Sequence, residues 1–346
     1  MTLRDEILEQ PAVAERFLAT QAGPVAAIAD ALRARGFRHV VIAARGTSDH
    51  AAIYAQYALG VRHGLAVGLG TPSVVSLYEA APDVRDALVI GISQSGESPD
   101  IVAVVAAGRA QGAPTIAITN EADSPLARTA DWTIGLGAGP ERAIAATKTY
   151  TSELLAVALL STALGGISGD DRAALAAMPD AIAAALGTEG DIRRIAAEQA
   201  ADTRAVVVAR GFEYATAREW ALKLKELAHV FADPYSSADF RHGPLALVEP
   251  GVPVLAVARS GLAAGDVIAL LERLRDELQA ESMVVSDDPA TLELATWPVR
   301  LPAGTPEWLG PIVSIVPGQL HAMHLTMARG LDPEQPRNLS KVTRTT

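Results

Sequence analysis

The sequence predicts an α/β protein made of two similar, doubly wound parallel-sheet domains in tandem, followed by a C-terminal tail. Short apolar runs, typical of strands buried on both faces, alternate with helical segments through short loops. The pattern then repeats, because residues 206–211 (VVVARG) resemble residues 41–46 (VIAARG). The composition agrees, since 49% of the residues are hydrophobic but only 4% are aromatic, which suits helices packed through small side chains.

The first half of the chain carries the clearer alternation. Residues 1–35 are predicted to be helical, with breaks at Pro11 and near Gly23-Pro24. The first domain is expected over 36–165, with strands at 38–44, 65–69, 87–92, 113–119 and 131–136. Helices are predicted at 45–63, 73–81, 99–110 and 146–164.

The second half repeats this plan after a helical connector at 166–201, with helices around 171–187 and 190–201. The second domain is expected over 202–328, with strands starting near Arg204 and Val252 and others at 282–286 and 297–301. A polar, proline-rich tail occupies 329–346.

Composition also excludes several classes of function. The net charge is -11 and no basic run occurs, so we expect no nucleic-acid partner. The absence of cysteine excludes disulfides, thiolate metal sites and cysteine nucleophiles. No apolar run approaches the length of a membrane span, so we expect a cytoplasmic protein with no membrane partner.

The stretch 87–100 (ALVIGISQSGESPD) is the centre of the functional prediction. A buried strand leads into a hydroxyl-rich loop, and Ser98 and Pro99 suit the N-cap and first turn of a helix. Free backbone N–H groups and the helix dipole favour a bound phosphate at such a junction. The alternative is a capped turn with solvated serines, because the loop has neither a P-loop lysine nor GxGxxG spacing.

A second strand-to-helix junction carries similar groups at Gly46, Thr47 and Ser48. In a parallel sheet the strands end at one edge, where ligands bind. We therefore expect Ser48 to share that edge with Ser93, Ser95 and Ser98. In the second half, Phe212 and Glu213 replace Thr47 and Ser48, and Arg259 replaces Gln94. We expect the second copy to have lost this phosphate loop, leaving one sugar-phosphate site per chain.

Three places in the second half carry groups that can move protons. Lys223 and Glu226 are three residues apart on a predicted helix and share a face, although a surface ion pair would have the same spacing. His242 precedes Gly-Pro in a turn, where it could reach a ligand or be an ordinary loop histidine. The tail around Lys341 has the composition of a frayed end.

These motifs occur together in the order found in one family. They are Gly46-Thr-Ser48, Ser93-Gln-Ser-Gly-Glu-Ser98, Ala146-Thr-Lys148, Ala221-Leu-Lys-Leu-Lys-Glu226, His242-Gly-Pro-Leu-Ala-Leu247 and Gln335-Pro-Arg-Asn-Leu-Ser-Lys341. The whole chain resembles the tandem SIS (sugar isomerase) domain family, with its flavodoxin-like domains. The resemblance is to the isomerase part of glucosamine-6-phosphate synthase and to SIS-type glucosamine-6-phosphate deaminases.

The resemblance implies a role for each matching residue. Glu226 would move the proton between C1 and C2 of the sugar, and His242 would assist ring opening from the neighbouring subunit of a homodimer. Lys341 would contact the open-chain sugar or form an imine with it, and Lys223 would lie beside these groups. The sugar phosphate would be held by Ser48, Ser93, Gln94, Ser95 and Ser98. Other substrate contacts would come from Gly46, Thr47, Ala145 and Arg337.

The implied reaction is conversion of glucosamine 6-phosphate to fructose 6-phosphate and ammonia, with a phosphorylated aminosugar as substrate and neither a metal nor an organic cofactor. The alternatives are a related aldose–ketose isomerase, a fructosamine-phosphate deglycase and a non-catalytic sugar-phosphate sensor. The sequence has no glutaminase domain, so we expect no ammonia release from glutamine. Arg45, Ser98 and Asp239 stand where cysteine, threonine and glutamate are usual.

Overall fold

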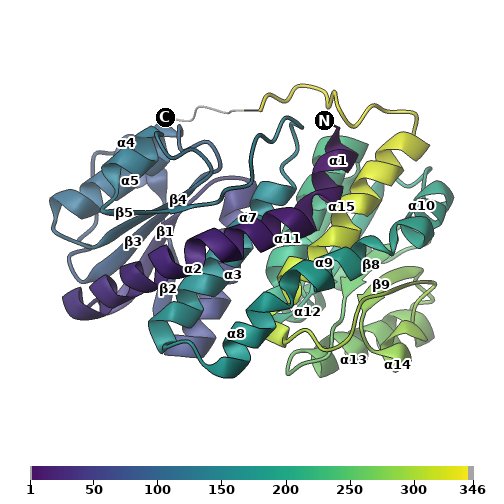
Figure 1. Ribbon diagram of the computed structural model, residues 1–346. Helices are drawn as coiled ribbons and strands as arrows, with labels where there is room; N and C mark the ends of the chain where they lie inside the picture. The colour runs from purple at the N-terminus through teal and green to yellow at the C-terminus, as the bar shows by residue number, and fades with distance from the viewer. Residues whose placement is uncertain (1, 342–346) are drawn as a thin grey trace. The chain divides into compact units, whose positions relative to one another are not determined.

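The computed structural model describes residues 2–341, which form two compact units with one parallel sheet each (Figure 1). The first-sheet unit comprises Ala12–Glu141, Lys148–Ala176 and, from the tail, Ser340 and Lys341. The second-sheet unit comprises residues 2–11, Arg142–Thr147 and Ala177–Leu339. The predicted pair of α/β domains is therefore confirmed.

All strand pairs in both sheets are parallel, and both sheets have the same strand order. The first sheet has the order β2-β1-β3-β4-β5. Its strands are β1 (His39–Ala43), β2 (Ala66–Leu69), β3 (Ala87–Ile92), β4 (Thr115–Thr119) and β5 (Trp132–Gly135). The second sheet has the order β10-β9-β8-β6-β7. Its strands are β6 (Arg204–Ala209), β7 (Phe231–Ser236), β8 (Val254–Val257), β9 (Ser282–Ser286) and β10 (Trp297–Arg300).

Helices cover the first sheet (Figure 1), and the central strand β3, whose six residues are all buried, needs such cover on both faces. The core on one face joins Ala43, Val89 and Ala117 of the sheet to Ile101 and Val105 of α5. The helices of this unit are α2 (Gln10–Arg35, entering from the other unit), α3 (Thr47–His63), α4 (Pro72–Ser76), α5 (Pro99–Ala110), α6 (Pro125–Thr129), α7 (Lys148–Gly165) and α8 (Gly169–Ala176).

The second-sheet unit repeats this packing and adds a central helix, α15 (Gly310–Ala328). Val206 and Val254 of its sheet pack on Leu270 and Leu274 of α13, as β1 and β3 pack on α5. Its α-helices are α1 (Leu3–Leu8), α9 (Met178–Leu186), α10 (Glu189–Glu198), α11 (Tyr214–Lys223), α12 (Ser237–Arg241), α13 (Ala264–Asp276), α14 (Pro289–Leu292) and α15 (Gly310–Ala328). Shorter turns are η1 (Gly211–Glu213), η2 (Leu224–Ala228), η3 (Pro244–Leu247) and η4 (Glu307–Leu309).

Three details differ from the sequence predictions. The break near Gly23-Pro24 is wrong, because α2 continues through Pro24. Pro24 is exposed, so water can bond the Thr20 carbonyl that loses its usual donor. The predicted connector helix at 171–187 is divided at Ala177 into α8 and α9. Strand β7 was not predicted. It contains Pro234, which an edge strand tolerates.

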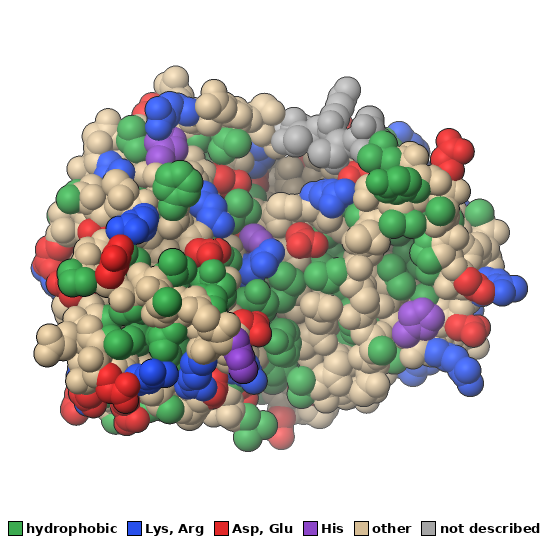
Figure 2. All heavy atoms as spheres, turned by 180° about the vertical axis from the view of Figure 1, so that it is seen from behind, with side chains coloured by type: hydrophobic (Ala, Val, Ile, Leu, Met, Phe, Trp, Pro, Cys, Tyr) green, Lys and Arg blue, Asp and Glu red, His purple; other side chains and the backbone are tan. Residues whose placement is uncertain are grey.

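Charge on the molecular surface is mixed. On the face drawn in Figure 2, Lys and Arg side chains lie among Asp and Glu side chains without forming a continuous basic area. Within residues 2–341, no helix is both long enough and apolar enough to cross a membrane.

A buried histidine connects three helices of the second-sheet unit. Trp220 on α11 donates its indole N–H to Nδ1 of His321 on α15 at 3.1 Å. Nε2 of His321 lies 2.8 Å from Oε1 of Gln199, which follows α10. Because the indole can only donate, Nδ1 accepts and Nε2 carries the proton. Burial lowers the pKa of His321 to about 3, so the ring is neutral in the folded protein at pH 7.

This pKa predicts a loss of stability at mildly acidic pH. The unfolded chain takes up a proton on His321 below pH 6.5, whereas the folded chain does not until about pH 3, so falling pH favours unfolding. Between pH 7 and 5 the cost is about 2 kcal/mol. We expect His321→Gln, whose amide can accept from Trp220 and donate to Gln199, to remove this part of the pH dependence in urea unfolding. His39→Gln, outside the network, is the control, and an equal pH dependence in all three proteins would contradict this assignment.

Candidate active site

The serine loop, residues 93–98, joins β3 to α5 at the carboxyl edge of the first sheet. Ser98 is the N-cap residue and Pro99 begins the helix, as predicted, although the Ser98 hydroxyl makes no cap bond. Gly96 has a φ of 62°, and a Cβ there would collide with the side chains of Ser124 and Thr119. The turn therefore requires glycine.

Short-range bonds hold the loop and leave several donors available. The Ser93 hydroxyl accepts from the Gly96 N–H at 3.1 Å, and the Ser95 hydroxyl accepts from the Glu97 N–H at 3.3 Å. Among the described residues, the backbone N–H groups of Gln94, Ser95 and Ser98 make no hydrogen bond. Unpaired N–H groups at a helix N-terminus are the elements of an anion site.

The second junction lies beside the first, because β1 and β3 are adjacent strands. Gly46 is the N-cap residue of α3, and Thr47 begins the helix. Ser48 is buried and donates its hydroxyl to Oε1 of Glu153 on α7 at 2.8 Å. In this conformation its hydroxyl proton is therefore hydrogen-bonded to that carboxylate. Arg45, the departure from the family pattern, bonds the buried Asp100 carboxylate of α5 at 3.0 Å and thereby ties the two junctions together.

A polar cavity of about 830 Å³ opens beside the serine loop. Two predicted phosphate residues line it, Gln94 and Ser95, and so does Lys341 of the tail. The polar lining residues that lie outside the predicted motifs are Asn120, Glu121, Asp123, Ser124, Arg128 and Glu141. This volume is enough for a sugar phosphate.

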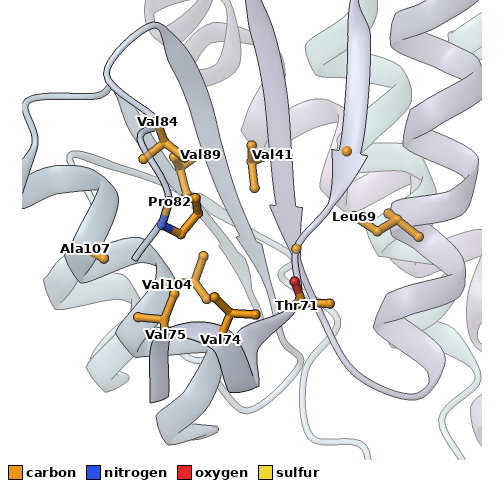
Figure 3. A pocket seen from close by; sticks show the side chains of 12 residues that line it. Val41, Leu69, Thr71, Val74, Val75, Pro82, Val84, Val89, Val104 and Ala107 are labelled. Carbon is orange, nitrogen blue, oxygen red and sulfur yellow. The ribbon is translucent and has the colours of Figure 1, made fainter. Parts of the chain in front are cut away.

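Another cavity in the same unit, about 210 Å³, has a different character. Figure 3 shows it surrounded by aliphatic side chains, including those of Val41, Val74, Val89 and Val104. Thr71 supplies the one labelled hydroxyl. Without convergent donors this cavity does not suit a phosphosugar, so the cavity beside the serine loop is the candidate site.

Glu141 binds the tail inside the candidate site. Its side chain has no exposed surface, and Oε2 lies 2.8 Å from Nζ of Lys341. The backbone N–H and the hydroxyl of Thr149 donate to the same carboxylate at 3.1 and 2.7 Å. These donors fix the carboxylate in place, and the carboxylate positions the lysine. The predicted frayed end is therefore wrong for Lys341. Residues 342–346 lie outside the described part.

The acid–base group lies in the second-sheet unit. Nζ of Lys223 is 2.6 Å from Oε2 of Glu226 and 3.3 Å from Oε1 of Glu219. Burial lowers the pKa of Lys223, but the two carboxylates outweigh it and raise the pKa above its ordinary value. The ion pair that the spacing allowed is therefore present, with Lys223 buried at 1% exposure and Glu226 partly exposed at 23%.

The backbone around Glu226 is unusual. Residues 224–228 form a π-helical turn after α11, and His229 ends it at a φ of 56°. π-helical turns are rare and occur often at functional sites. Arg337 donates to Nδ1 of His229 at 2.9 Å, so the tail contacts the end of this turn. Burial and the adjacent Arg337 lower the pKa of His229, which keeps the ring neutral.

The remaining predicted residues are placed less informatively. His242 is exposed and lies at the C-terminal end of α12, just before Gly243 and Pro244. This agrees with its predicted position in a turn. Ala145 is buried in the loop Arg142–Thr147, where Glu6 accepts from the backbone N–H of Arg142 at 2.5 Å. Within the described part of the chain, no cluster of three or more His, Asp or Glu side chains could hold a metal ion.

Sequence reasoning missed Glu141 and Glu219. Glu141 follows Gly139-Pro140 in a loop, a pattern that indicates only a solvated turn. Its partner Lys341 belongs to the tail, which is 200 residues further along the chain. Glu219 could have been found, because it precedes Lys223 by four residues and so shares its helical face.

The Glu141–Lys341 pair can be tested by proteolysis. We expect Glu141→Gln to keep the fold, because the amide oxygen still accepts from Thr149, and to release Lys341. Trypsin should then cleave after Lys341 about tenfold faster, the loss of a charged hydrogen bond of roughly 1.4 kcal/mol. Glu121→Gln is the matched control, since Glu121 lines the same cavity without contacting Lys341. Equal cleavage rates, measured by mass spectrometry, would contradict the pairing.

The chain matches the model of the SIS domain family twice, over residues 35–163 and 200–328. The glutamine–fructose-6-phosphate aminotransferase (isomerizing) of Pyrococcus horikoshii is 34% identical over 343 residues, covering 97% of this chain and 56% of that protein. The corresponding enzyme of Aeropyrum pernix is 37% identical over 351 residues, with the same coverage. The chain therefore spans little more than half the length of these relatives.

Solved structures give the same result. A protein of Silicibacter pomeroyi assigned as a phosphosugar isomerase is 35% identical, with a TM-score of 0.87 over 96% of this chain and 100% of that one. The glucosamine-6-phosphate deaminase of Thermotoga maritima has a TM-score of 0.79 over the full length of both chains. At 21% identity, that likeness is one of fold.

Proposed function

We propose that this chain, which belongs to the SIS domain family, isomerises an aminosugar phosphate, converting glucosamine 6-phosphate to fructose 6-phosphate and ammonia. The observation that carries the proposal is the Glu226 carboxylate, partly exposed beside the buried Lys223 ammonium. A carboxylate held in this way is a general base with a fixed orientation.

Substrate binding starts at the phosphate in this proposal. The free N–H groups of Gln94, Ser95 and Ser98, together with the Ser95 hydroxyl, bind the phosphate oxygens at the N-terminus of α5. Lys341 lines the same cavity and contacts the open-chain sugar, while Glu141 positions its ammonium group. Fixing the phosphate leaves the reacting carbons at a set distance along the chain of the sugar.

Glu226 transfers the proton in this proposal. In the open-chain aldehyde form, the carboxylate removes the proton from C2 and returns it to C1. With an N–H proton of the amine passing to the C1 oxygen, the carbon–nitrogen bond at C2 becomes an imine, and water hydrolyses it to the ketone of fructose 6-phosphate with release of ammonia. Lys223 orients Glu226, since its ammonium group lies 2.6 Å from the carboxylate.

His242 assists ring opening and comes from a neighbouring chain of a homodimer. Its support is the exposed turn at the end of α12, which presents the imidazole to the surface. Histidine is suited to this step because its unperturbed pKa lies near neutrality.

Free ammonia tests the reaction directly. The protein should release ammonia from glucosamine 6-phosphate in an amount equal to the fructose 6-phosphate formed. Galactosamine 6-phosphate and a fructosamine phosphate complete the panel, and each would identify a different substrate. Binding of these compounds without exchange of the C2 proton in deuterated water would overturn the enzyme assignment and favour a sensor.

Glu226→Gln separates catalysis from binding. The amide is nearly isosteric but cannot accept the C2 proton, so kcat should fall by about 10²–10⁴-fold while binding of the phosphosugar is kept. Glu272→Gln, at an exposed position of α13, controls for the loss of one charge. Proton exchange and ammonia release at the parent rate in Glu226→Gln would show that Glu226 is an ion-pair partner only.

A further inference from the structure

The second sheet has its own counterpart of the serine loop. Because the two sheets share one strand order, the loop from β8 to α13, residues 258–263, occupies the position of residues 93–98 between β3 and α5. In the first-sheet unit the N–H groups of Gln94, Ser95 and Ser98 are available to a ligand. In the second-sheet unit the N–H groups of Ser260, Leu262 and Ala263 are bonded to carboxylates.

Glu307 supplies most of these bonds. Its Oε2 and Oε1 accept from the backbone N–H groups of Leu262 and Ala263 at 3.0 and 3.1 Å. Ala263 is the N-cap residue of α13 and cannot cap the helix itself. The carboxylate lies against Gly261, where a Cβ would overlap it. A carboxylate from 44 residues away thus occupies the place that a phosphate takes at such a helix.

A buried arginine completes the same cluster. The Arg259 side chain is 3% exposed and bonds Asp287 through Nη2 at 2.9 Å. Its Nε and Nη1 have no hydrogen-bond partner in the described residues. Arg210, Arg259 and Glu307 line one small hollow of about 10 Å³, which is too small for another group while Glu307 is present.

We propose that the β8–α13 loop is a second anion site, that the Glu307 carboxylate is its resident anion, and that its removal admits a phosphate-sized oxyanion. The Leu262 and Ala263 N–H groups and the two free nitrogens of Arg259 then become the donors. This goes beyond loss of the serines in the second copy. The site keeps its anion-binding backbone and is closed by an acid of the same chain.

Inorganic phosphate tests this inference. By titration calorimetry, Glu307→Ala should bind one more phosphate per chain than the wild type. It should also lose roughly 2–4 °C of melting temperature and recover it in phosphate but not in chloride of equal ionic strength. Glu293→Ala, an exposed acid of the same unit, is the control and should match the wild type in both measurements.

The test compares the phosphate stoichiometry and the phosphate-dependent stabilisation of Glu307→Ala with those of Glu293→Ala. The result therefore does not depend on the proposed reaction at the serine loop. Equal stoichiometry and equal phosphate-dependent stabilisation in the two variants would overturn the inference. If Glu307→Ala does not fold, Glu307→Gln is judged by the same difference, since it removes the charge and keeps the shape. Adding Ser95→Ala to each variant assigns the extra phosphate to the second-sheet unit.

Discussion

The structure depends on how a parallel sheet reverses its strand order between neighbouring strands. At that point in each sheet, two adjacent strands end together and their chains leave in different directions, so helix N-termini with unpaired N–H groups meet there. The protein must satisfy these donors with a ligand or with its own side chains. The first-sheet unit leaves the N–H groups of Gln94, Ser95 and Ser98 open, and the second-sheet unit bonds those of Ser260, Leu262 and Ala263 to carboxylates.

Most of the fold was predictable because its signal is local. Buried parallel strands are continuous apolar runs, and β3 and its loop were located to the residue. The predictions that failed concern features that depend on solvation and on neighbouring elements. Pro24 was taken as a break, although an exposed position lets a helix tolerate it. Strand β7 begins at the exposed Phe231 and contains a proline, and only its place at the edge of the sheet makes it a strand.

The candidate site was predictable in its composition but not in its electrostatics. Spacing placed Lys223 and Glu226 on one face, yet burial of the lysine between two carboxylates is a property of packing. The role of Glu141 depends on a tail distant in sequence. Ser48 lies at the expected edge, and its hydroxyl bonds Glu153, a partner that the sequence did not indicate. Residue type and position identify the possible groups, and their partners decide how each is used.

The wide turn at residues 224–228 makes this helix sensitive to length as well as to composition. A π-helical turn accommodates a residue more than the surrounding α-helix does, so deleting one residue there would let the backbone relax to regular geometry. If the deleted residue were Leu224 or Lys225, Lys223 and Glu226 would be two residues apart, and side chains two apart on an α-helix do not share a face. A chain shortened in this way gains a regular α-helical backbone in this segment and loses the Lys223–Glu226 ion pair at the same time. Insertions and deletions, rather than substitutions, are thus the changes that this segment is least able to absorb.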